Sequence, residues 1–139
     1  MIATRTRVVQ AGLTSAAIAS TAFALVFFVL LIGSPGDAGL SVVNVILMSV
    51  LGLFTATVAF FGFLTGIFTI GILAYVALES LKLTGPAWAV ATGTVLAFGG
   101  AWLIFDASSS RLGQTALIAA AVGGGLGGLS FRHVVRQAP

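Results

Sequence analysis

The chain has 139 residues, of which 59% are hydrophobic and 6% are charged, and its mean hydropathy is +1.19. An average soluble domain has about 25% charged residues, so a soluble fold is excluded and lipid is the expected solvent. The net charge of +3 comes from basic residues that stand singly or in pairs beside apolar segments, which is typical of membrane topology; no nucleic-acid partner is expected.

In lipid, every backbone N–H and C=O group must be bonded within the protein, which leaves helices or a closed barrel. The apolar runs here are long and continuous, unlike the ten-residue alternating segments of a barrel. The sequence therefore predicts an all-α integral membrane protein, a four-transmembrane-helix bundle with a single transmembrane domain over residues 1–139. The alternative is five crossings, with a turn near 62–66.

The first helix is expected over about residues 10–32. It follows Arg5 and Arg7 and ends at the sequence GSPGDAG, whose Gly and Pro residues stop helices. Its apolar part is longer than the roughly 7–15 residues of a cleaved signal peptide, which favours a first membrane crossing.

Residues 40–78 form an apolar run without a charged side chain, which as one helix would be about 58 Å long. A turn at residues 62–66 would make it two crossings, whereas a helical interior would make it one. With four crossings in all, Arg111 lies alone on one side and five basic residues lie on the other: Arg5, Arg7, Lys82, Arg132 and Arg136. The positive-inside rule favours this arrangement, with both termini cytoplasmic.

The single crossing is expected over about residues 54–80. The apolar lead-in, 40–53, would then lie along the interface, protrude as a tilted helix, or dip into the membrane and return.

The third helix is expected over about 86–105, because Pro86 suits a first helical position and Trp88 and Trp102 suit opposite interfaces. The fourth is expected over about 112–131. Its glycine-rich sequence GGGLGGL, residues 123–129, predicts a locally open or kinked helix that would line any pore.

Small residues recur every four positions, which places them on one face of each helix and lets backbones approach closely in lipid. Thr115 belongs to this pattern, and the predicted packing residues are Gly12, Ala16, Ser20, Ala24, Gly62, Gly66, Ala89, Gly93, Ala97, Ala101, Ala119, Gly123 and Gly127. They predict a tight bundle within one chain, or else self-association or docking on a larger membrane complex.

Two polar residues are candidates for a transport or polar site. Glu79 lies at the edge of a predicted span, where it is expected either to pair with Lys82 at i,i+3 or to face the bundle as a proton or cation site. Asn44 is either an interhelical hydrogen-bonding group or an interfacial one. His133 is expected to meet lipid phosphates.

No pattern for a catalytic centre, metal site or cofactor is found, since the chain has no cysteine, one histidine and three acidic residues. We therefore expect a non-catalytic multi-pass protein of the cell (inner) membrane that binds no cofactor. Its expected role is a self-associating or accessory subunit of a membrane complex. The alternative is a small oligomeric channel or transporter.

Overall fold

The structure is a computed structural model that describes residues 2–32, 42–83, 85–104 and 110–136, with the side chains of 2–5, 31–32 and 42–45 left out. All regular structure in these ranges is helical. The elements are α1 (Ile2–Ile32), α2 (Val42–Gly66), the π-helical segment η1 (Ile67–Gly71), α3 (Ile72–Ser80), α4 (Pro86–Ile104) and α5 (Arg111–Arg136).

Four helices in the described residues are long and apolar enough to cross a membrane: Thr6–Leu30, Ile46–Ser80, Pro86–Ile104 and Arg111–Arg136. The prediction of an all-helical chain with four apolar helices is confirmed at this level. The observed helices extend beyond the predicted ones at two ends, since α1 begins at Ile2 and α5 continues to Arg136.

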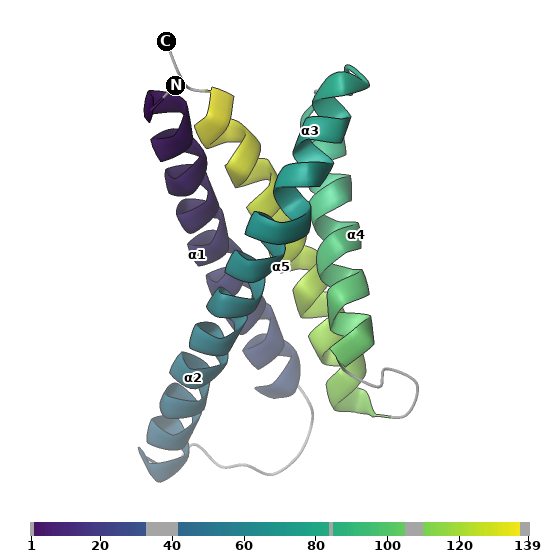
Figure 1. The fold of residues 1–139 in the computed structure, drawn as a ribbon. Coiled ribbons are helices and arrows are strands. Elements are labelled where there is room, and N and C mark those ends of the chain that lie inside the picture. The colour runs from purple at the N-terminus through teal and green to yellow at the C-terminus, as the bar shows by residue number, and fades with distance from the viewer. Residues whose placement is uncertain (1, 33–41, 84, 105–109, 137–139) are drawn as a thin grey trace.

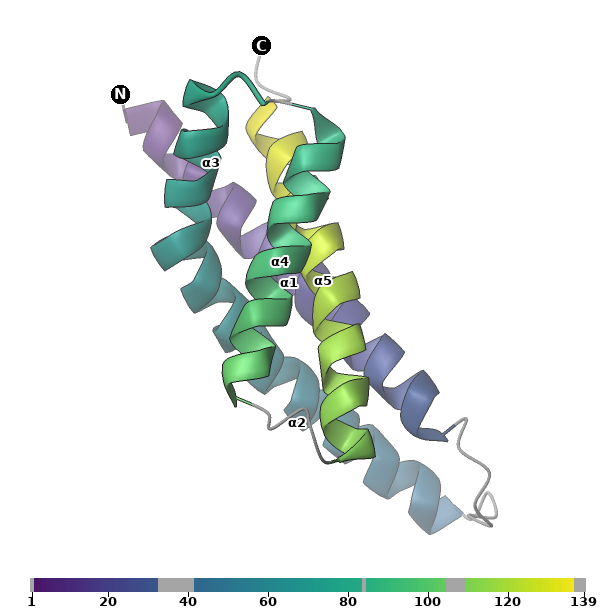
Figure 2. The same cartoon turned by 90° about the vertical axis from the view of Figure 1, so that its right-hand side faces the viewer.

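α5 is the central helix. It packs against α1 along one side and against α4 along the other, so these three helices form one layer (Figures 1 and 2). In its most apolar stretch 56% of residues are buried, whereas none are buried in the corresponding stretch of Ile46–Ser80. Most of the core is therefore built from α5 and its two neighbours.

Residues 42–80 form one continuous helix, made of α2, η1 and α3 and called the long helix below. The turn near 62–66 that five crossings require does not occur, because both glycines lie inside α2. The lead-in does not dip and return either; from Val42 onward it is the first part of the same helix.

The long helix changes its hydrogen-bonding pattern once. In η1 the backbone is π-helical, and the N–H of Ile72 bonds to the carbonyl of Ile67, five residues earlier. The Thr69 hydroxyl donates to Thr65 O at 2.7 Å, which occupies a carbonyl that a regular α-helix would offer to the Thr69 N–H. The chain passes through this segment without ending the helix.

Consecutive long helices run in opposite directions. The start of α1, the end of α3 and the end of α5 lie at one end of the bundle (Figure 1), called the basic end below. Five basic residues belong to this end by their positions in the chain: Arg5, Arg7, Lys82, Arg132 and Arg136. Arg111 opens α5 at the opposite end.

The predicted opening of the last helix at GGGLGGL is not observed. α5 is an unbroken α-helix from Arg111 to Arg136, and Gly123, Gly124, Gly125 and Gly127 are buried in it. Glycine costs a helix in water about 1 kcal/mol relative to alanine. Here the missing side chains are instead used for contact with neighbouring helices.

Candidate functional site

The predicted ridge on α5 faces α1. Its members, Thr115, Ala119, Gly123 and Gly127, are all buried. A methyl group added at Gly123 would lie 2.7 Å from Ala19 O, and one added at Gly127 would lie 3.0 Å from Ala19 Cβ. Neither glycine has room for a side chain.

The ridge predicted on α1 includes Gly12, Ala16 and Ser20, which are buried, and Ala24, which is half-buried. The α1 residues that lie closest to the α5 glycines are Ser15 and Ala19, each one position before a predicted ridge residue. Gly12 faces elsewhere: the Phe68 ring of η1 lies 2.7 Å from the place of its absent Cβ. The small residues of α1 thus serve two neighbours, α5 and the long helix.

The ridge predicted on α4 packs against α5. A methyl group at Gly93 would overlap the backbone of Gly124, and one at Gly128 would overlap the backbone of Ala89. The Thr94 hydroxyl donates to Ala121 O at 3.3 Å and adds a polar contact between the two helices.

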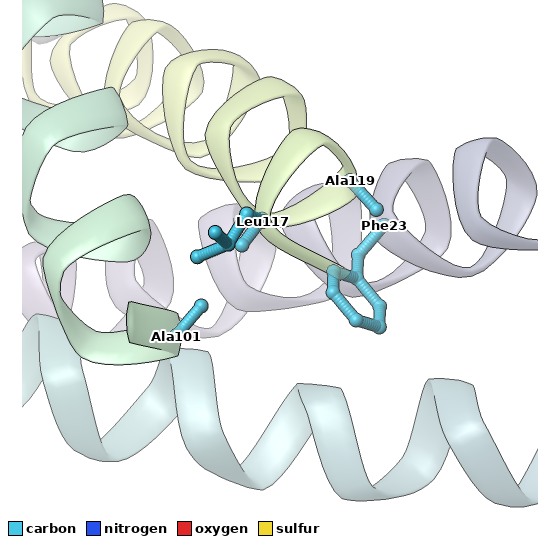
Figure 3. Close-up of a cluster of buried hydrophobic side chains, with 5 residues drawn as sticks. Phe23, Ala101, Leu117 and Ala119 are labelled. Carbon is cyan, nitrogen blue, oxygen red and sulfur yellow. The ribbon is translucent and has the colours of Figure 1, made fainter. Parts of the chain in front are cut away.

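Two further members of the α4 ridge also meet α5. A methyl group at Gly124 would overlap the side chain of Ala97. Ala101 is buried at the end of the ridge, where Leu117 of α5 points toward it (Figure 3). The other buried members of this cluster are Phe23 of α1 and Ala119 and Ala120 of α5.

α5 therefore carries two small-residue faces, of which only the one facing α1 was predicted. The second, Gly124 and Gly128, faces α4. Its signal was present in the sequence as a second four-residue glycine spacing inside GGGLGGL. The second face was not predicted, because the run of glycines was expected to weaken the helix.

Gly62 and Gly66 lie in α2, and within the described part of the chain no atom lies within 4 Å of the place where either Cβ would be. Both glycines are exposed, and both border a groove between the long helix and the layer of α1, α4 and α5. They do not join the packing glycines of the other helices. Asn44 lies in α2, but its side chain falls outside the described residues.

This groove has a volume of about 580 Å³ and is open along one side. Aromatic rings explain why it exists. The long helix meets the bundle through Phe63 on Phe23, with ring centroids 6.3 Å apart, and through Tyr75 on Phe131 at 5.5 Å. Because rings are much larger than glycine and alanine, the long helix packs less closely on α4 than α5 does.

Most of the groove wall is apolar, including Phe54, Ile67 and Leu96. Among the residues that the structure describes, the charged ones lining the groove are Glu79 of α3 and Arg132 and Arg136 of α5, all at the basic end of the bundle. The groove is therefore apolar along its length and has ionic groups at one mouth.

The i,i+3 pair expected between Glu79 and Lys82 is not present among the described residues. Lys82 has φ = 58° and stands just past the end of α3. Its N–H bonds to Glu79 O at 3.0 Å and the N–H of Leu83 bonds to Leu78 O at 2.9 Å, which is a Schellman motif. Since Lys82 has left the helix, its side chain no longer shares a helical face with Glu79.

No protein family model matches the chain, and no curated protein or solved structure matches it. The groove and the packing faces are therefore interpreted from their own geometry.

The close contact between α4 and α5 predicts a specific mutational effect. Gly124→Ala should lower the free energy of unfolding in detergent–lipid micelles by about 1–3 kcal/mol, because the new methyl group forces the two helices apart. Gly62→Ala is the matched control: its methyl group meets open space, so this variant should gain about 0.5–1 kcal/mol from helix propensity. Equal stability of the two variants would contradict the packing described here.

Proposed function

We propose that this chain is a non-catalytic multi-pass subunit of the cell (inner) membrane, which associates with a second copy or with a larger membrane complex. The observation that carries the proposal is the length of the long helix. Its apolar part, Ile46–Ser80, has 35 residues and is therefore about 52 Å long.

A bilayer cannot cover this helix by tilt alone. The hydrocarbon core is about 30 Å thick and membrane helices tilt by up to about 40°. At that tilt the helix would still extend about 40 Å along the membrane normal, so roughly two turns of apolar helix would lie outside the hydrocarbon. A contact with another protein helix would cover this surplus.

The surplus falls at the start of α2, the end away from the basic end of the bundle (Figure 1). There Ile46, Val50 and Leu53 are 59%, 62% and 73% exposed. The small-residue faces of α4 and α5 are already occupied within the chain, so they do not supply the association surface that the sequence suggested. The exposed apolar start of α2 is the better candidate for the association surface.

The distribution of charge supports the proposed orientation. By their positions in the chain, five of the six basic residues belong to the basic end and only Arg111 to the other. By the positive-inside rule, the basic end and both chain termini would be cytoplasmic, and the start of α2 would face the opposite side.

Cysteine crosslinking in native membranes tests this proposal, because the chain has no cysteine of its own. Val50→Cys should form crosslinked species when it is labelled with a maleimide–benzophenone reagent and irradiated, because the photoreactive arm needs no thiol on the partner. A band at twice the monomer mass would identify a second copy, and other bands a larger complex. Leu103→Cys is the control, since Leu103 of α4 is 87% exposed but lies away from the start of α2. Crosslinking that is equal at both positions, or absent at position 50, would refute the proposal.

The second candidate is a small oligomeric channel or transporter, and the groove favours it. The groove is open and has a carboxylate, Glu79, at one mouth. In a transporter this side chain would be the first residue to test, because ionisable groups near membrane spans commonly mark ion pathways.

A flux measurement separates the two candidates. For a packing subunit, proteoliposomes containing the purified chain and a pH-sensitive dye should show no more proton flux than protein-free vesicles. Flux above that background that is lost in Glu79→Gln would instead establish transport. Glu79→Asp, which keeps the carboxylate, is the control for a purely structural effect of the substitution.

A further inference from the structure

The groove combines two chemical features that occur together in amphiphiles. Its length is lined by apolar side chains of the long helix, α4 and α5, and its charged residues gather at one mouth. Its volume of about 580 Å³ falls in the range of about 300–1,000 Å³ that is typical of small-molecule sites.

The charges at the mouth fit a phosphate group. Arg132 and Arg136 are four residues apart on α5, which places them on the same helical face. Guanidinium groups bind phosphate through paired N–H donors, and among the described residues two of them line the groove together with one carboxylate, Glu79. A headgroup with one net negative charge would balance the charges of these three described residues, and its hydroxyl groups would have the Glu79 carboxylate as an acceptor.

We infer that the groove binds one phospholipid with an anionic headgroup, with an acyl chain along the apolar wall and the phosphate between Arg132 and Arg136. This inference does not depend on a protein partner at α2, since the groove lies on the side of the long helix that faces α4 and α5.

The level of the mouth in the bilayer agrees with this assignment. Trp88 lies in the first turn of α4 and is 48% exposed, and Tyr75 lies one turn before Glu79. Tryptophan and tyrosine are enriched at membrane interfaces, where phospholipid phosphates lie. The mouth is thus at headgroup depth when the bundle is placed in a bilayer.

The headgroup must provide the selectivity. An acyl chain gains little by moving from bilayer to groove, because lipid tails are as apolar as the groove wall. Each basic residue near an anionic lipid surface contributes about 1 kcal/mol, so the two arginines together should give a preference of about thirtyfold. A zwitterionic lipid with the same acyl chains should show much less preference.

Native mass spectrometry of the purified full chain tests the inference. The protein would be mixed with equal amounts of phosphatidylglycerol and phosphatidylcholine carrying identical acyl chains. One phosphatidylglycerol should bind with at least tenfold preference over phosphatidylcholine. The double variant Arg132→Gln/Arg136→Gln should lose that preference, whereas Arg111→Gln, at the other end of α5, should keep it.

A second variant separates acyl-chain binding from simple charge attraction. Gly62→Leu fills the groove without changing any charge, and Gly62 has open space beside it, so the fold should be retained. This variant should bind at least fivefold less phosphatidylglycerol, while millimolar glycerol phosphate should fail to displace the lipid from the unmodified chain. Equal binding of the two lipids, a preference that survives the double arginine variant, or full binding by Gly62→Leu would each overturn the inference.

Discussion

The bundle depends on the backbone-to-backbone approach of α5 to both of its neighbours. Gly123 and Gly127 let α1 come close on one side, and Gly124 lets α4 come close on the other. Such contact matters most in a membrane, where lipid tails remove the hydrophobic drive between helices and packing must provide the association. Two glycine faces on a single helix make α5 the centre of the structure.

The long helix is held in a different way, and the difference creates the candidate site. It contacts the layer through aromatic rings such as Phe63 and Tyr75, which keep its backbone away from α4 and α5. The resulting space is the groove. The same helix is also too long for one bilayer. It therefore has two separate candidate surfaces: the start of α2, proposed for a protein partner, and the side that faces α4 and α5 across the groove, proposed for a lipid.

Much of the architecture could be predicted from composition and charge. The absence of a turn at residues 62–66 was correctly expected, because only that topology placed five basic residues together. For the lead-in, 40–53, the sequence left three arrangements open, and from Val42 onward the continuous helix is the one observed. The small residues predicted on α4 lie against α5, because a four-residue spacing places them on one helical face regardless of the partner.

The pairing of faces could not be predicted in the same way. Spacing shows that Gly12 and Gly62 lie on small-residue faces, but it does not say whether a backbone, a ring or open space lies opposite. Gly12 meets Phe68, and Gly62 meets no described atom within 4 Å. The groove was missed because it comes from the difference in size between residues on separate helices. The Glu79–Lys82 pair was expected but is not present among the described residues, because α3 ends between these two positions.

Both proposed surfaces require residues 42–80 to cross a bilayer once, and cysteine accessibility tests this most directly. A single cysteine at Thr65, in the middle of the long helix, would be exposed to a membrane-impermeant maleimide from each side of sealed vesicles, with Ser34 and Ala138 positions as controls. We predict that position 65 is protected and that position 138 reacts only from the cytoplasmic side. Labelling at position 65 together with access to 138 from the outside would contradict the account.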